Sequence, residues 1–199
     1  MNTLQDEYYI IRRANNDNYP LFSWDQSSGQ FGMGKPVEVK GPVKMRLGNP
    51  ISPHFEWVDY HVVPDPVVSP LIADALASLD LHGVQLVPAV VRHPKETGPF
   101  PEVHDYWFVH VWHRIHCLDR EKSEIEYYDG DKIFGIDKLV LDVKTLGMFE
   151  LRKRLVFELA EKTSVLLVHE SIKDAIEAVK PKGCRFFRAT DWNSDCTFD

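Results

Sequence analysis

The sequence has few cysteines, no long apolar run and no basic, then apolar, opening, and each of these absences excludes some classes of protein. Its 199 residues include three cysteines, Cys117, Cys184 and Cys196, a sparse and odd-numbered set typical of reduced thiols in a cytosol. One disulfide among them is the alternative. No run of about 18 apolar residues occurs, so we expect no membrane span. The opening MNTLQDEYYII lacks a basic start followed by an apolar stretch, so we expect no signal peptide and a cytoplasmic location.

The chain also lacks the short motifs of catalytic and nucleotide-binding sites. It contains no G-x-S-x-G elbow for a serine nucleophile. It contains neither G-x-x-x-x-G-K-[ST] nor G-x-G-x-x-G, so no loop for phosphate binding is visible. Cys117 and Cys184 fall at positions expected to pack in the core, and Cys196 lies in a tail that we expect to be mobile. We therefore predict no catalytic residue, no cofactor and no enzyme activity.

Three histidines and a cysteine, His110, His113, His116 and Cys117, are the residues best suited to bind a metal. A strand over residues 106–118 would place His110 and His116 on one face, about 20 Å apart, and His113 on the other. This separation argues against a metal site. A metal-dependent enzyme that uses these histidines stays an alternative.

Acidic charge is concentrated in two stretches. Of the net charge of −7, residues 119–131 carry −4 and residues 191–199 carry −3, so the rest of the chain is neutral. Such a surface repels nucleic acid and suits a basic protein partner. A solvated hairpin and a frayed tail are the alternative. The residues that we predict to contact a partner are Asp119, Glu121, Glu124, Glu126, Asp129, Asp131, Trp192 and Asp195.

One segment recurs with an offset of 100 residues. Residues 68–89 (VSPLIADALASLDLHGVQLVPA) and 168–189 (VHESIKDAIEAVKPKGCRFFRA) share six identical positions without a gap, against roughly one or two expected by chance. In each copy, apolar residues at i, i+3, i+4 and i+7 predict a short helix. Gly83 and Gly183 then predict a turn, and the apolar residues that follow predict a strand.

Between the copies, the sequence predicts antiparallel strands. Residues 106–118 alternate over one long strand, residues 124–128 form the next, and Asp129-Gly130 is a hairpin signal. Another strand is expected over residues 136–143. The fold class is therefore α+β, a single domain with two related helix–turn–strand units flanking a long antiparallel β-meander. We expect one domain over 1–199, made of a first repeat unit (55–92), the β-meander (103–150), a second repeat unit (163–190) and an acidic tail (191–199).

The order of these segments resembles the immunity-protein-eleven family, formerly a domain of unknown function. The likeness covers about residues 56–190, with a weaker echo in EYYIIRR near the start. Its motifs serve packing: a serine-capped helix, a strand after a glycine, and an aromatic strand ending in LDREKS (118–123). The histidines of the aromatic strand depart from the family pattern, and His169-Glu170 replaces the serine cap of the second helix. The family accompanies bacterial polymorphic toxins, including those delivered by contact-dependent and type VI secretion.

The resemblance implies a cytosolic antitoxin that binds a cognate secreted toxin and blocks its active site. A nuclease toxin fits, because a cleft built for phosphates is complementary to carboxylates. We expect a basic toxin as partner, no nucleic acid, no membrane, and a monomer or weak homodimer. A self-associating scaffold that uses exposed Phe108 and Trp112 is the remaining alternative.

Overall fold

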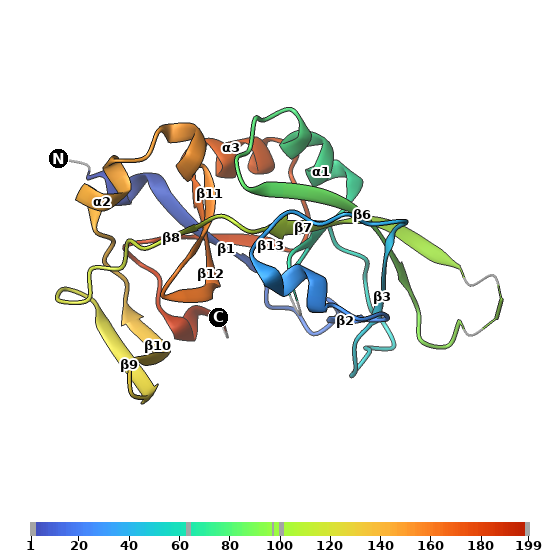
Figure 1. The fold of residues 1–199 in the computed structure, drawn as a ribbon. Helices are drawn as coiled ribbons and strands as arrows, with labels where there is room; N and C mark the ends of the chain where they lie inside the picture. Colours follow the sequence, from blue (N-terminus) through green and yellow to red (C-terminus); the bar gives the residue numbers. More distant parts are fainter. Residues whose placement is uncertain (1–2, 63–64, 97, 100–101, 198–199) are drawn as a thin grey trace.

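Two mixed β-sheets lie next to each other in the computed structural model, and two helices cover the same side of both (Figure 1). The structure describes residues 3–62, 65–96, 98–99 and 102–197. The six-stranded sheet has the order β2-β3-β6-β7-β5-β4, with strands Phe22–Trp24, Val43–Leu47, Val84–Arg92, Val103–Val111, Val67–Val68 and Tyr60–His61. The five-stranded sheet has the order β13-β1-β12-β11-β8, with strands Cys184–Arg188, Tyr8–Arg13, Lys162–His169, Val156–Leu159 and Arg114–Ile115.

The remaining elements are a separate hairpin, three α-helices and four 3₁₀ turns in the described part of the chain. The hairpin consists of β9 (Glu124–Asp129) and β10 (Lys132–Lys138). The helices are α1 (Pro70–Ala77), α2 (Val143–Gly147) and α3 (Glu170–Ala178). The 3₁₀ turns are η1 (Leu4–Glu7), η2 (Gly29–Met33), η3 (Leu151–Arg154) and η4 (Ser194–Thr197). The α+β prediction is confirmed, and no described helix could span a membrane.

The predicted repeat is present as two strand–helix–strand units. In the first, α1 connects β5 to β6, and β7 lies between these two strands. In the second, α3 connects β12 to β13, and β1 lies between them. Both middle strands run antiparallel to their neighbours, and the register is the same in the two units. The equivalent cross-strand triplets are Val68–Trp107–Pro88 and Val168–Tyr9–Arg188.

A glycine with positive φ directly precedes the strand that follows the helix in each unit. Gly83 has φ +72° and Gly183 has φ +91°. A Cβ at Gly83 would lie 2.3 Å from Cβ of His113, and a Cβ at Gly183 would lie 2.6 Å from Cβ of Val58. Both the backbone angle and the close approach require glycine, because a side chain in this region is strained and would clash.

The two helices begin differently from the sequence expectation. Ser69 precedes α1, but its hydroxyl donates to Oδ1 of Asp59 at 2.7 Å, and no side chain caps the helix. At α3 the cap is His169, whose Nδ1 accepts from the amide of Ser171 at 3.2 Å. The serine-cap expectation is therefore wrong for α1, where Pro70 in the first helical turn leaves one amide fewer to satisfy.

Two predicted strands end earlier than expected. The strand that begins at Val103 stops at Val111, and Arg114–Ile115 (β8) pairs in parallel with β11 of the other sheet. The chain crosses between the sheets here. The amide of Trp112 still donates to the carbonyl of Gly83, next to β6, whereas the carbonyl of His113 accepts from the amide of Glu158 in β11. Strand β10 stops at Lys138, so the strand expected over 136–143 is wrong beyond that residue.

The side chain of Gln5 replaces strand pairing just beyond β10. Its amide nitrogen donates to the carbonyl of Leu139 at 3.0 Å, and its oxygen accepts from the amide of Leu141 at 3.0 Å. Asp142 then caps α2 by accepting from two amides of the first turn. A buried glutamine thus satisfies the backbone where the strand ends.

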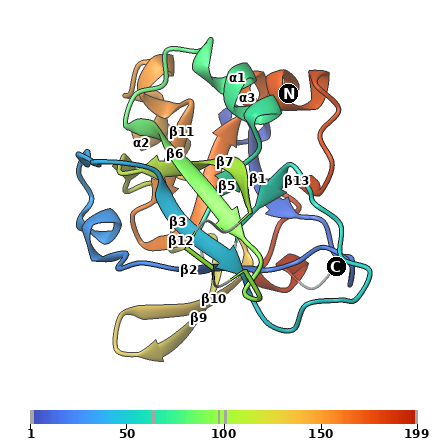
Figure 2. The ribbon, with the colours of Figure 1, turned by 90° about the vertical axis from the view of Figure 1, so that its right-hand side faces the viewer.

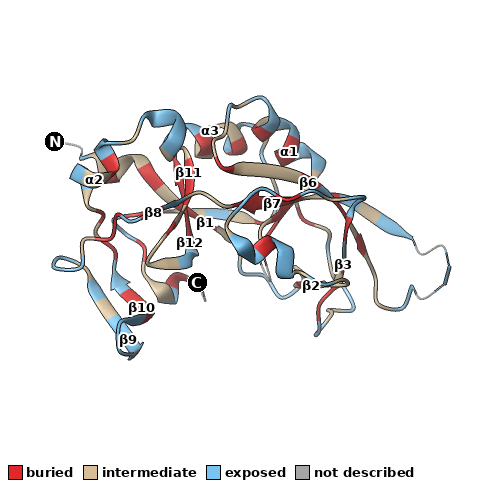
Figure 3. Ribbon diagram, viewed as in Figure 1, coloured by how far each residue is buried: buried red, intermediate tan, exposed pale blue. Residues whose placement is uncertain are grey.

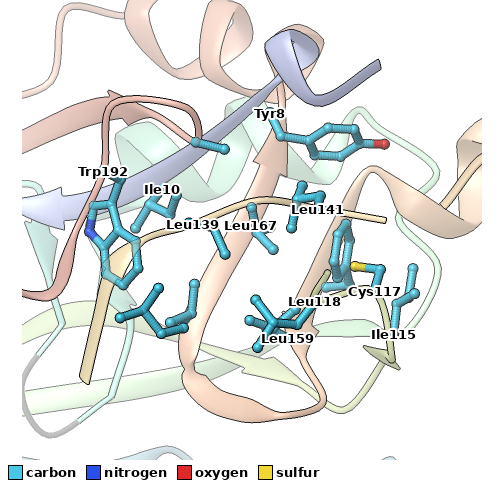
Figure 4. Close-up of a cluster of buried hydrophobic side chains, with 14 of the residues drawn as sticks. Tyr8, Ile10, Ile115, Cys117, Leu118, Leu139, Leu141, Leu159, Leu167 and Trp192 are labelled. Atoms are coloured by element: carbon cyan, nitrogen blue, oxygen red, sulfur yellow. The ribbon is translucent and has the colours of Figure 1, made fainter. Parts of the chain in front are cut away.

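Buried side chains form three clusters, and the red segments of Figure 3 mark where they lie along the ribbon. One cluster lies between the helices and the sheets, and includes Ile72 of α1 and Ile172 of α3. A second packs the six-stranded sheet under η2, whose Phe31 is buried. The third joins the five-stranded sheet to the hairpin and the C-terminal segment, and contains Ile10 and Trp192 (Figure 4). Both faces of the central strands are therefore covered.

Candidate functional site

The β9–β10 hairpin projects from the body of the protein as a two-stranded sheet of its own, at the lower left of Figure 1 and the bottom of Figure 2. Ile133 and Ile136 face the core, and Ile125 packs against it. Lys162 donates from Nζ to the carbonyl of Phe134 at 2.8 Å, which ties the hairpin to β12. The hairpin is anchored on one side and open on the other.

The outward side of the hairpin carries large aromatic side chains. Tyr128 is 77% exposed, Phe134 is 63% exposed, and their ring centroids are 6.4 Å apart. Tyr127 is 46% exposed. Sequence reasoning noted the hairpin turn but missed these rings as candidates. The available signal was the Tyr-Tyr pair and the Phe placed on either side of the predicted turn.

The predicted acidic residues surround this turn but differ in role. Glu121, Glu124, Glu126 and Asp131 are exposed, and the side chain of Asp129 lies outside the described part of the structure. Asp119 instead stabilises the loop before β9. Its carboxylate accepts from two loop amides, and from Nζ of Lys122 at 2.6 Å. The lysine hydrogen bond lowers the pKa of Asp119. We therefore assign Asp119 to the structure of the loop.

The C-terminal segment packs against the hairpin. The amide of Ile136 donates to the hydroxyl of Ser194 at 2.8 Å. Trp192 is 2% exposed and Cys196 is buried. The expectations of a mobile position for Cys196 and a partner contact for Trp192 are therefore wrong, because both side chains complete the third core cluster. Asp195 is exposed, so the tail adds a carboxylate beside the hairpin.

The histidines of the aromatic segment lie in different surroundings. His110 is buried, with Nε2 2.8 Å from the carbonyl oxygen of Lys35. His113 faces the ring of His82, and burial lowers the pKa of His113. His116 is exposed, 3.5 Å from a carboxylate of the β11–β12 turn. Among the described residues, no group of three or more His, Cys, Asp or Glu side chains could hold a metal ion.

The cysteines are free thiols in buried or half-buried positions. Burial raises the pKa of Cys117 to about 12 and that of Cys184 to about 11. A thiol with so high a pKa is protonated at neutral pH and is a poor nucleophile. No thiolate chemistry is expected from these two positions.

Phe108 does not form an exposed dimer face. It is 2% exposed and packs against Phe31 of η2, with ring centroids 4.6 Å apart. Trp112 is half-buried. The scaffold alternative is wrong about Phe108, because the glycine-rich segment before residue 35 covers that side of β7.

A cleft between the two sheets brings together residues that no sequence pattern connects. It encloses about 210 Å³ and is lined by side chains from β1, the loop before β5, β7, β11 and β12. Asp65 and Glu158 are its carboxylates. Burial, and after it the charge of the neighbouring Glu158, raise the pKa of Asp65 to about 6.

A family model described as "Immunity protein family (Imm11)" matches residues 3–191. No curated protein matches the chain.

Proposed function

Because the chain belongs to the Imm11 immunity protein family, we propose that it binds a cognate bacterial toxin through the β9–β10 hairpin and blocks the toxin's active site. We choose this surface because of three features of the hairpin. It exposes large rings at its end, has acidic side chains around them, and belongs to neither main sheet. This role is inhibition by binding and needs no catalytic residue of the immunity protein.

Exposed aromatic rings are suited to anchor a protein interface. Tyrosine and other aromatic side chains are enriched at interface centres, where a few residues carry most of the binding free energy. Complete burial of a side chain of this size contributes about 1.5–3 kcal/mol. Tyr128 and Phe134 also contact each other, so they would enter a partner as one unit.

The acidic side chains favour a basic partner. Glu121, Glu124, Glu126, Asp131 and Asp195 are exposed and lie on or beside the hairpin. Such a surface accelerates association with a positively charged protein and weakens as salt screens the charges. A toxin that cleaves nucleic acid fits, because its phosphate-binding cleft is positively charged. We infer a cytoplasmic protein that meets its toxin as a monomer or weak homodimer, in a polymorphic toxin system such as one served by type VI secretion.

Co-expression with the open reading frame next to its own tests the antitoxin role. The expected result is that growth is rescued and that the two proteins co-purify. Toxicity that persists together with separate elution of the two proteins would contradict the proposal.

Variants of the hairpin test the surface. Tyr128→Ala combined with Phe134→Ala should weaken toxin binding by about a hundredfold or more, mainly through faster dissociation. Leu71→Ala combined with Met148→Ala, two exposed apolar residues on other elements, is the matched control and should bind as the unaltered protein does. Equal affinity of all three proteins would exclude the hairpin as the anchor.

Charge reversal tests the electrostatic part. Changing Glu121, Glu124, Glu126 and Asp129 to Lys should slow association by about tenfold or more at low salt and flatten its salt dependence. The control changes four exposed acids elsewhere to Lys, which alters the net charge equally: Asp17, Glu38, Glu102 and Asp105. If the two quadruple variants behave alike, net charge and not the hairpin sets the rate.

A further inference from the structure

The cleft between the sheets has an acidic part and an aromatic part. Its mouth continues into a more open hollow that shares Phe31, Asp65 and Glu158 with the inner cleft and adds Trp24 and Arg114. These residues come from β2, η2, the loop before β5, β8 and β11, so the site exists only in the folded chain.

The two carboxylates are not equivalent. Glu158 accepts from Nε of Arg114 at 2.8 Å, so its charge is compensated. Asp65 accepts a hydrogen bond from the side chain of Trp24. Within the described part of the chain, the ion pairs do not include Asp65. Asp65 is thus a half-buried carboxyl group that accepts from a neutral donor and forms no ion pair among the described residues, with His110 as the cationic side chain near enough to lower its pKa.

Aromatic rings form the wall beside Asp65. The rings of Trp24 and Phe31 are stacked with centroids 5.4 Å apart, and Phe31 lies 4.6 Å from Phe108. The face of an aromatic ring attracts a cation within about 6 Å of its centroid, and tryptophan does so most strongly. Aromatic rings next to an uncompensated carboxylate are a suitable environment for a weakly hydrated organic cation.

Arg12 and His110 also line the inner cleft, and each contacts a backbone carbonyl. Arg12 donates to the carbonyl of Ser164 at 3.3 Å and lies over the ring of Trp192, 5.5 Å from its centroid. Nε2 of His110 lies 2.8 Å from the carbonyl of Lys35. Arg12 also forms no ion pair with a described residue, and its buried Nε has no hydrogen-bond partner, but Arg12 does not line the outer hollow. In that hollow, Arg114 and Glu158 pair with each other, and Asp65 is the charged side chain outside an ion pair. A metal ion, which prefers several oxygen ligands, is not matched by one free carboxylate among rings.

We propose that this cleft binds one organic cation, a guanidinium or alkylammonium group, with Asp65 as its counter-ion and the rings of Trp24 and Phe31 as its wall. The group has two sources, a basic side chain of the toxin or a free small amine. Only the first source rests on the proposed function. Glu158, held by Arg114, adds negative potential without being the direct partner.

Titration of the isolated protein with agmatine tests the site, with N-butylurea as a neutral probe. The indole N–H signal of Trp24, assigned by its loss in Trp24→Phe, should shift in a saturable way with agmatine at pH 8 and not with N-butylurea. In Asp65→Asn, which keeps an acceptor for the indole, agmatine affinity should fall about tenfold or more. Asp17→Asn, an exposed aspartate elsewhere, should bind agmatine as the unaltered protein does.

Calorimetry of the same three proteins gives a second measurement that does not depend on the indole signal. Absence of saturable agmatine binding by both methods would overturn the proposal, as would equal affinity in Asp65→Asn. Adding saturating toxin then separates the sources. Loss of agmatine binding in the complex identifies a toxin side chain, and unchanged binding identifies a free amine. The agmatine titration needs no toxin, so it can fail or succeed independently of the antitoxin role.

Discussion

Replacing Asp65 by Asn should stabilise the protein at pH 8 and only about a third as much at pH 4.5. In the folded state, burial and then the adjacent Glu158 raise the pKa of Asp65 from 3.8 to about 6. At pH values between the unfolded and the folded pKa of Asp65, the folded chain binds more protons at this site than the unfolded chain does. The free energy of unfolding therefore decreases as pH rises through this window, and the penalty is complete above about pH 7.

The size of the effect follows from the shift. About two pKa units correspond to about 3 kcal/mol for a fully desolvated group. Asp65 is only half-buried and keeps the Trp24 hydrogen bond, so screening by solvent reduces this to about 1–2 kcal/mol. For a chain of this length, the midpoint of thermal unfolding should rise by about 3–6 °C at pH 8.

Urea unfolding followed by fluorescence at pH 8 and pH 4.5 measures this difference directly. Asp17→Asn provides the control, because Asp17 is exposed on a loop away from the cleft. A gain of equal size at both pH values would show that the effect is not electrostatic. A loss of stability at pH 8 would show that the carboxylate stabilises the fold, and the reasoning about Asp65 would be refuted.

Three further perturbations have defined outcomes. Gly83→Ala should lower the free energy of unfolding by at least about 2 kcal/mol in urea titration, because of the positive φ and a 2.3 Å contact, whereas Gly41→Ala meets no atom within 4 Å and should be neutral. Gln5→Leu should cost about 2–4 kcal/mol in the same assay, because a buried carbonyl and a buried amide lose their partners. Glu158→Gln should lower the pKa of Asp65, read from its carboxyl carbon shift by NMR; an unchanged value would show that burial alone is responsible.

The repeat could be predicted because its signals are local. Helical spacing, the glycine after it and the following apolar residues all lie within 22 residues of each copy, and the structure places them as expected. The middle strand of each unit could not be predicted in this way. It comes from β7 after the first copy and from β1 long before the second, so the pairing depends on contacts between remote segments.

Exposure of a local charged run could be predicted from the sequence, whereas contacts between segments far apart in the chain could not. The exposed hairpin acids could be predicted, because a charged run around a turn signal rarely enters a core. Trp192 was misassigned because its neighbours in sequence are polar, whereas the side chains that bury it come from β1 and the hairpin segment. The cleft gave no signal, since Trp24, Asp65 and Glu158 are far apart in the chain and meet only when the two sheets pack.

The position of the hairpin in the chain explains how a binding surface can exist without cost to the fold. Each repeat unit contributes strands and one helix to one of the two main sheets. The hairpin lies between α1 and α3 in the sequence and belongs to neither sheet. It contributes to the core through inward isoleucines, while its outward rings contact each other and are largely exposed. Substitutions among the outward residues would therefore alter the proposed binding surface and remove little buried apolar area. The cleft is the opposite case, because Asp65 lies where the two sheets meet and its charge opposes folding. A cation that compensates this charge would link ligand binding to stability, which the hairpin does not require.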